Sequence, residues 1–240
     1  MSSDFTLGLL GSGRLASHIA AAAEKQNVHT LAIKGAELRA AAPPEVLGNT
    51  GTRRLVLLDA SAGEAAEAHL GWALKLGAPF VLGTTGHGLT RAAVAARVGD
   101  RIGVLLAPNF APGAILLGRI AEAAGAWCAA GDFSPFLEER HHALKKDAPS
   151  GTALWIDARL KSTGGPALPI TATRAGQLPG AHTLGLHAPG ELLEFSHTAL
   201  SRDCYGTGAM AACRYLLART GVHGIEDWAA ELFPWPRNQK

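Results

Sequence analysis

The residues best suited to chemistry lie in one run, residues 139–154, with the sequence ERHHALKKDAPSGTAL. Two adjacent histidines, His141 and His142, are followed by Lys145. An imidazole gives or takes a proton near neutral pH, and an ammonium group neutralises a carboxylate. This spacing predicts a site that protonates a small anionic substrate.

The same run continues into a signal for the start of a helix. Pro149 loses nothing in a first turn by lacking an N–H, and the hydroxyl of Ser150 can cap the free backbone amides. The remaining amides point outward at the positive end of the helix dipole, where anions bind. A cradle of amides beside a proton donor suits an enzyme whose substrate carries carboxylates.

Two other kinds of chemistry fit this run poorly. Neighbouring histidines on a strand point to opposite faces, and no further ligand lies two residues away, so we expect no metal site. Ser150 lacks the G-x-S-x-G context of a nucleophilic serine.

The N-terminal residues have the order of a dinucleotide-binding turn. An apolar strand over residues 5–10 leads into a glycine turn and then an Ala-rich helix from Arg14 to Lys25. The pattern G-x-G-x-x-G/A is met by Gly11, Gly13 and Ala16. The alternative is a plain turn between strand and helix. We predict that the cofactor is bound here by Gly11, Ser12, Gly13, Arg14 and Leu15.

Three further apolar runs, each ending in a polar or glycine-rich loop, predict more strands of the same sheet. They cover residues 54–60, 79–83 and about 102–107, and a helix is expected over residues 64–76. Strands alternating with helices form a parallel sheet that binds ligands beyond its carboxyl ends. The loops at those ends add Gly83, Thr84, Thr85, Ala107, Pro108, Asn109 and Phe110 to the predicted cofactor site.

The choice between the two nicotinamide cofactors depends on the end of the second strand, residues 29–33. NAD-specific sites usually place an acidic residue there, whereas this chain has Lys34. A cation favours the 2′-phosphate of NADPH, so we expect NADPH or NADH with a mild preference for NADPH. A solvated surface lysine is the alternative.

The second half of the chain has a different rhythm. A helix over residues 114–125, a strand over residues 133–140 that delivers His141 and a helix over residues 150–161 precede three β-like runs. We predict an α/β protein: a Rossmann-like nucleotide domain, residues 1–112, completed by the C-terminal segment 206–240, which is predicted to be helical over residues 206–233. A substrate and oligomerisation domain of α+β type with an open mixed sheet spans 113–205. An open sheet needs a cover, which favours a homo-oligomer.

Composition narrows the class of protein. The 240 residues are 48% hydrophobic and 18% charged, with a net charge of +2, which is typical of a soluble globule without a nucleic-acid-binding stripe. No long apolar run or leader is present, and three cysteines without metal-ligand spacing fit a reducing compartment. We therefore expect a cytoplasmic protein with no nucleic-acid or membrane partner.

The central run closely resembles the signature H-H-x-x-K-x-D-A-P-S-G-T-A of the 4-hydroxy-tetrahydrodipicolinate reductase (dihydrodipicolinate reductase) family, with every fixed position present. The GTTG and PNF loops and the later TRAGQLPGAHTL and SHTALSR segments are also similar to that family.

This resemblance implies NAD(P)H-dependent reduction of 4-hydroxy-tetrahydrodipicolinate in diaminopimelate and lysine biosynthesis, by a tetramer. It implies that His141 and Lys145 donate protons. It also implies that the dicarboxylate substrate is bound by His142, Ser150, Gly151 and Thr152.

The alternative function is another NAD(P)-linked dehydrogenase or reductase of a small dicarboxylate or amino acid on the same scaffold. Such an enzyme would lack the HHxxKxDAPSGTA run. A non-catalytic nucleotide sensor would keep the glycine turn and lose His141 or Lys145. Arg174 is left open between a substrate carboxylate and a structural salt bridge. His182, His187 and His197 are interpreted as structural or solvent-facing.

Overall fold

The computed structural model describes residues 5–234, which form two compact units. The first unit comprises the chain up to Phe110 together with Asp203–Trp228. The second comprises Ala111–Arg202 and, among the described residues, 229–234. Each unit has its own β-sheet. The second unit is therefore an insertion into the sequence of the first.

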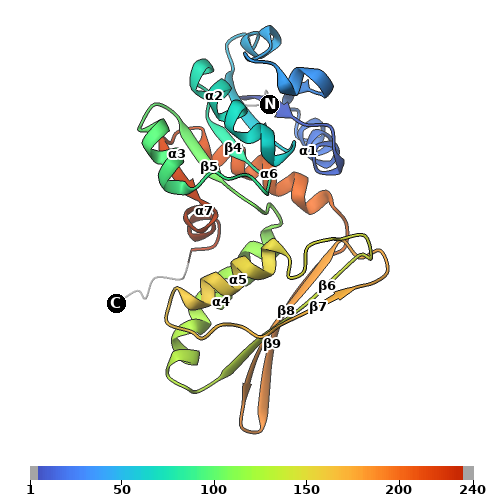
Figure 1. The fold of residues 1–240 in the computed structure, drawn as a ribbon, viewed down its shortest axis with the longest axis vertical. Helices are drawn as coiled ribbons and strands as arrows, with labels where there is room; N and C mark the ends of the chain where they lie inside the picture. Colours follow the sequence, from blue (N-terminus) through green and yellow to red (C-terminus); the bar gives the residue numbers. More distant parts are fainter. Residues whose placement is uncertain (1–4, 235–240) are drawn as a thin grey trace. The chain divides into compact units, whose positions relative to one another are not determined.

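The first unit contains a parallel sheet of six strands in the order β10-β5-β4-β3-β1-β2 (Figure 1). The strands are β1 (Phe5–Leu10), β2 (His29–Ile33), β3 (Arg54–Asp59), β4 (Phe80–Leu82), β5 (Gly103–Leu106) and β10 (Gly221–Gly224). The helices are α1 (Arg14–Lys25), α2 (Ala66–Leu76), α3 (Arg91–Val98), α6 (Asp203–Leu216) and α7 (Ile225–Leu232), with short 3-10 turns η1 (Gly35–Arg39), η2 (Glu45–Gly48) and η3 (Gly63–Ala65).

The central strands form because their residues are apolar on both faces. All of β1 and β4 is buried, as the sheet is covered on both sides by helices. Helix α2 ends at Gly77, whose φ of 61° lies in the left-handed region that glycine adopts without strain. The parallel register places the carboxyl ends of β1 and β3 together, with Leu10 opposite Asp59.

The prediction of a wholly helical segment over residues 206–233 is wrong in one respect. The segment contains β10, which pairs in parallel with the edge strand β5. Its sequence, Gly-Val-His-Gly, has too few apolar residues to show a period of two. The segment is a strand because it pairs with β5, and its own sequence does not favour a strand. Helix α7, which follows β10, is joined to α3 by ion pairs from Arg91 to Glu226 and Asp227, both at 2.7 Å.

The second unit contains a mixed sheet of four strands in the order β7-β6-β8-β9. Strands β6 and β7 are parallel, whereas β6, β8 and β9 are successively antiparallel. The elements are α4 (Pro112–Ala129), β6 (Ser134–His141), α5 (Gly151–Lys161), β7 (Ile170–Arg174), β8 (Gly180–Ala188) and β9 (Glu191–Ala199).

Helices α4 and α5 lie side by side over one face of this sheet (Figure 1). Close approach is possible because α4 carries glycines where it meets its neighbour. A Cβ on Gly118 would lie 2.0 Å from the Trp155 ring, and one on Gly125 would lie 2.2 Å from the Leu160 carbonyl oxygen. Leu137 and Leu184 of the sheet complete the apolar core below the helices.

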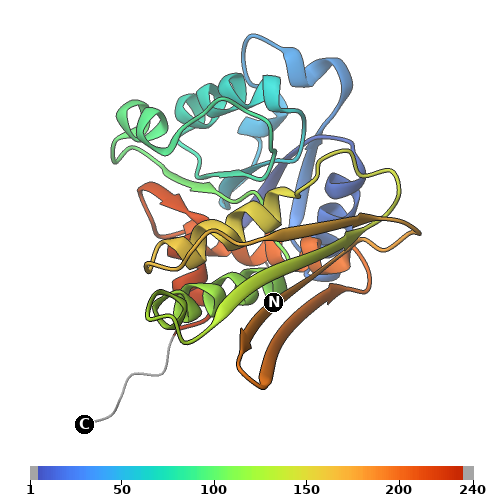
Figure 2. The same cartoon turned by 60° about the horizontal axis from the view of Figure 1, so that its bottom comes forward.

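The other face of the mixed sheet carries mainly polar side chains. Along β6, Pro135, Leu137, Glu139 and His141 are buried and alternate with more exposed residues. On the open face, the hydroxyls of Thr183 and Ser196 hydrogen-bond across β8 and β9 at 2.8 Å. Figure 2 shows the long hairpin that these two strands form.

The predicted fold class is confirmed: a Rossmann-like parallel sheet is combined with a separate α+β unit built on an open mixed sheet. Among residues 5–234 we find no helix whose length and hydropathy would allow it to cross a bilayer.

Candidate active site

The glycine turn after β1 requires glycine at its first position. Gly11 has a φ of 138°, and a Cβ there would lie 2.4 Å from the carbonyl oxygen of Ala60. Gly13 forms the N-cap of α1, and no described side chain caps the helix or places an acid in its first turn. The amides at this helix start therefore remain available to an anion such as a pyrophosphate.

A cavity of about 740 Å³ opens beside this turn. Its lining comes from the glycine turn, from η1 and from the residues after β3, and most of these residues are small. The charged residues of the lining are Arg39 and Glu64. Of the predicted cofactor residues, the cavity lining includes Gly11, Ser12 and Gly13. Lys34 is exposed and precedes η1, so the cation on the described cavity wall is Arg39. The glycine turn, the uncapped helix and the cavity together fit a dinucleotide.

The other predicted cofactor loops serve partly as packing. A Cβ on Gly83 would lie 2.5 Å from the ring of Phe110, which is 2% exposed. Ala107 is buried, and its N–H donates to the Leu82 carbonyl at 3.0 Å. Four remaining residues have solvent-accessible surface and stay predictions, namely Arg14, Leu15, Pro108 and Asn109.

Asp59, at the end of β3, is wholly buried and makes hydrogen bonds to residues around this cavity. Its Oδ1 accepts from the backbone N–H of Ser61 at 2.8 Å, the Ser61 hydroxyl at 2.6 Å and the Thr84 hydroxyl at 2.8 Å. Its Oδ2 lies 2.7 Å from Nδ1 of His69. Burial alone would raise the pKa of Asp59, but hydrogen bonds from His69 and Ser61 outweigh it and lower the pKa. Thr85, next in the loop, is exposed.

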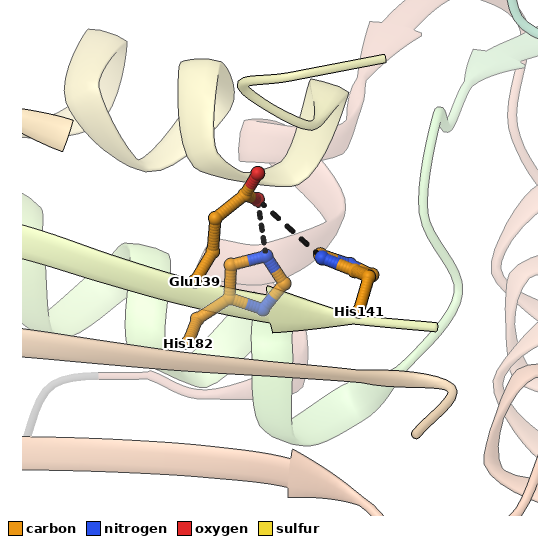
Figure 3. A group of neighbouring side chains, drawn as sticks. All are labelled: Glu139, His141 and His182. Atoms are coloured by element: carbon orange, nitrogen blue, oxygen red, sulfur yellow. Dashed lines mark ion pairs between the residues drawn. The ribbon is translucent and has the colours of Figure 1, made fainter. Parts of the chain in front are cut away.

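In the second unit, strand register gathers a buried cluster around Glu139 (Figure 3). Glu139 and His141 are two residues apart on β6, so both point to the helix-covered face. The antiparallel neighbour of Glu139 is His182 on β8. One carboxylate oxygen, Oε2, lies 3.5 Å from His182 Nε2 and 3.7 Å from His141 Nδ1.

The second oxygen of Glu139 anchors the loop that follows. Oε1 accepts from Arg174 Nη2 at 2.5 Å and from the backbone N–H of Ser150 at 3.0 Å. The Ser150 hydroxyl accepts from Ala153 N–H at 3.1 Å, which makes it the N-cap of α5, and lies 3.2 Å from His182 Nε2. The structure therefore uses Arg174 in a salt bridge, which is the structural alternative left open by the sequence.

These charges act on the proton affinity of His141. Burial lowers its pKa, as do the positive groups around it, and despite the opposing effect of Glu139 the pKa falls to about 4. The Nη1 group of Arg174 lies 3.5 Å from His141 Nδ1. His141 is therefore neutral at pH 7 in the free protein, with Nδ1 facing a donor and the proton assigned to Nε2.

Lys145 points its ammonium group at the carboxylate of Asp147, at 2.8 and 2.9 Å. Burial raises the pKa of Asp147, whereas hydrogen bonds from Lys145 and the backbone N–H of Gly151 act more strongly and lower it. The Asp147 carboxylate thus occupies the position, between an ammonium group and a helix start, that the sequence assigns to a substrate carboxylate. His142 and Thr152 are half-buried beside this loop, and their predicted substrate contacts stay predictions.

Sequence reasoning missed Glu139 and His182 as members of the site. Their Oε2, Nε2 and the His141 Nδ1 lie within 4.8 Å of one another, as three metal ligands could. The guanidinium of Arg174 already neutralises the same carboxylate, which favours an ion-pair network over a metal site. The period-two pattern of β6 could have flagged Glu139, whereas His182 depends on a register that the sequence does not show.

Comparison with known proteins covers both units. The sequence profiles described as "Dihydrodipicolinate reductase, N-terminus" and "Dihydrodipicolinate reductase, C-terminus" match residues 6–110 and 113–228. The chain belongs to the dihydrodipicolinate reductase family. Among similar family members, the 4-hydroxy-tetrahydrodipicolinate reductase of Sulfurimonas denitrificans is 31% identical over 72% of this chain and 75% of its own length. That of Sulfurovum sp. is 30% identical over 92% and 97%.

Solved structures agree with this assignment at the level of the fold. Dihydrodipicolinate reductase from Paenisporosarcina sp. TG-14, with bound dipicolinate, matches with a TM-score of 0.71 and 18% identity over 93% of this chain and 99% of that one. An engineered D-amino acid dehydrogenase bound to NADP+ matches with a TM-score of 0.57 and 12% identity over 98% and 97%.

Proposed function

We propose that this protein reduces 4-hydroxy-tetrahydrodipicolinate with NAD(P)H and a proton to tetrahydrodipicolinate and NAD(P)+, with the 4-hydroxyl group leaving as water, in diaminopimelate and lysine biosynthesis. The observation that carries this proposal is the amide and ammonium cradle of Lys145 and Gly151 beside buried His141. Family membership and relatives named for this reaction support it.

The protein's own groups divide the work. A bound nicotinamide supplies the hydride, and reduction of a conjugated C=N or C=C bond leaves negative charge that must be protonated. His141 and Lys145 donate protons, while the α5 start and the Lys145 ammonium bind a carboxylate. His142, Ser150 and Thr152 complete the substrate contacts.

Asp147 must yield its place to the substrate in this mechanism. Its carboxylate neutralises Lys145 in the free protein, and a substrate carboxylate offers the same charge at the same amides. The incoming dianion also adds negative charge near His141, which favours the imidazolium form needed for proton donation. Binding thus turns a neutral histidine into an acid.

We propose that the cofactor is NADPH or NADH, with a mild preference for NADPH. Arg39 supports the first because a guanidinium pairs well with a 2′-phosphate. Glu64 supports retention of NADH, since a carboxylate accepts from ribose hydroxyls. We expect Arg39→Ala to lower kcat/KM for NADPH relative to NADH, with Lys75→Ala, an exposed cation in the last turn of α2, as the control. An unchanged cofactor ratio in Arg39→Ala would remove Arg39 from the cofactor site.

The remaining parts of the proposal concern assembly and place in the cell. The unpaired edge of β9 in the β7-β6-β8-β9 sheet supports a homo-oligomer, with a tetramer expected. We also expect the protein to be cytoplasmic, because its three cysteines lack metal-ligand spacing and fit a reducing compartment. Light scattering of the purified protein tests the assembly: a monomeric mass at micromolar concentration contradicts it.

The decisive experiment follows the nicotinamide absorbance when freshly generated 4-hydroxy-tetrahydrodipicolinate is added to protein with NADPH, and then with NADH. Substrate-dependent oxidation establishes the reductase. A folded protein that binds cofactor yet oxidises neither contradicts the proposed substrate. Small amino acids and other dicarboxylates, tested in parallel, identify the alternative dehydrogenase.

A further inference from the structure

His69, on α2, lies between two hydrogen-bond acceptors. Its Nδ1 is 2.7 Å from Asp59 Oδ2, and its Nε2 is 3.0 Å from the backbone carbonyl oxygen of Leu38. The side chains of His69 and Asp59 are both 0% exposed, so water cannot complete either contact. A neutral imidazole carries one N–H and could serve only one of these acceptors.

Transfer of the proton to Asp59 would not resolve this conflict. Oδ1 of the same carboxylate already accepts from the Ser61 N–H, the Ser61 hydroxyl and the Thr84 hydroxyl. Three donors stabilise the ionised carboxylate and oppose its protonation. The ring of Trp72, 4.7 Å away and tilted by 51°, offers a cation an aromatic neighbour. The geometry therefore favours Asp59 as an anion and His69 as a cation.

The contact of His69 with the Leu38 carbonyl connects the Asp59–His69 pair to η1. Leu38 and Arg39 both belong to η1, and both line the cavity beside the glycine turn. Ser61, held by the other oxygen of Asp59, lines it as well. Asp59 and His69 therefore fix two separate segments of the cavity wall, η1 and the loop at Ser61, to the end of β3.

We propose that His69 is a positioning residue for the cofactor: as an imidazolium clamped between Asp59 and Leu38, it fixes the turn that presents Arg39 to the 2′-phosphate of NADPH. This inference rests on the proposed use of NAD(P)H. It assigns cofactor selectivity to a wholly buried side chain that touches neither cofactor nor substrate.

The protonation state can be read directly. In a long-range ¹H–¹⁵N spectrum, both ring nitrogens of His69 should show the shifts of protonated nitrogens, because each lies within hydrogen-bond distance of an acceptor. Assignment comes from the loss of that signal in His69→Gln. A spectrum with one unprotonated ring nitrogen overturns the clamp.

The positioning role is tested by equilibrium titration of His69→Gln with NADPH and with NADH. We expect the Kd for NADPH to rise about fivefold relative to that for NADH, since interacting residues couple on this scale. Loss of folded protein would weaken both cofactors equally, so the ratio separates positioning from structural damage. His18→Gln is the control because it removes a histidine–aspartate pair, at 3.1 Å to Asp203, elsewhere in the same unit.

A double-mutant cycle then shows whether His69 acts through Arg39. In an Arg39→Ala background, His69→Gln should leave the ratio of the two Kd values unchanged. A full additional fivefold effect there, or an unchanged ratio in His69→Gln alone, overturns the inference. Wild-type protein that binds neither dinucleotide contradicts the proposed function instead, and the NMR result still decides the charge of His69.

Discussion

Each unit has one buried carboxylate in the last part of a strand, Asp59 in β3 and Glu139 in β6, and the two differ in their hydrogen bonds. Asp59 has hydrogen bonds on both oxygens, from four donors in all. Glu139 has strong partners on Oε1, whereas its Oε2 has no hydrogen bond from any described group and faces His141 and His182 at 3.7 and 3.5 Å.

This difference suits one carboxylate to a structural role and the other to a role in the reaction. A carboxylate with hydrogen bonds to both oxygens fixes the groups around it, because moving one of them would leave a buried hydrogen-bonding group without a partner, which costs free energy. An unsaturated carboxylate keeps negative potential available to neighbours whose charge changes during turnover. The neighbouring His182 and the hydrogen bonds from Ser150 and Arg174 outweigh burial and hold the pKa of Glu139 far below its ordinary value, so it stays charged.

The largest effect is expected when the charge of Asp59, the carboxylate with hydrogen bonds on both oxygens, is removed. Asp59→Asn removes a buried negative charge that accepts from four donors, so we expect a loss of about 3 kcal/mol in the free energy of unfolding. Glu139→Gln should lose less, since Arg174 retains contact with solvent. Urea unfolding of both variants decides: equal losses would mean that the two carboxylates play the same structural role.

The proposed role of Glu139 in the reaction is tested through its neighbour His141. We expect His141→Asn to lower kcat about 100-fold or more, the range of general acid catalysis, with unchanged affinity for NADPH. His187→Asn, an exposed histidine on the same sheet, is the matched control. Near-native kcat in His141→Asn would end the proposed role of His141.

A smaller effect is expected from the backbone that supports His141. A Cβ on Gly180 would lie 2.9 Å from His141 Nε2, so Gly180→Ala must displace the ring. Misplacement of a proton donor should lower kcat about tenfold or more without changing the Kd for NADPH. Gly48→Ala, where a Cβ meets open space, provides the comparison. Equal kcat values in the two variants would show that the ring tolerates displacement.

The smallest expected effect is the pH dependence of stability. His141 has a pKa of about 4 when folded against 6.5 ordinarily, so the unfolded chain takes up this proton first as the pH falls. Stability is therefore lost between about pH 6.5 and 4, by about 1 kcal/mol at pH 6. His141→Asn should lack this part of the loss in denaturant titrations at about pH 7 and 6. Parallel curves for both proteins would contradict the lowered pKa.

The sequence predicts much of this fold because its signals are local. The bounds of β1, α1 and β2 follow from an apolar run, a glycine turn and the next apolar run. The N-cap role of Ser150 likewise follows from its neighbours alone. Strand β10 escapes prediction because an edge position beside β5, not its own sequence, makes it a strand.

The candidate site divides in the same way. His141 and Lys145 can be picked out because they share one short run. The His182–Glu139 and Asp59–His69 contacts depend on strand register and on helix packing over longer separations. The sequence also points to Lys34 as a cation beside the cofactor, which stays a prediction. The turn of η1 adds Arg39 to the cavity wall, a placement that the sequence alone does not show.

The insertion of residues 111–202 has a consequence for how the molecule is made. During synthesis, β5 emerges as an open strand edge long before residues 221–224 exist to pair with it. The first unit cannot finish its sheet until the second has been translated, and α6 must then return so that Gly208 seats against the Phe110 backbone. An unpaired edge is a site of aggregation in a growing chain. Chains truncated before residue 203 should therefore accumulate as insoluble protein, and the reductase depends on its last translated strand for solubility as much as for shape.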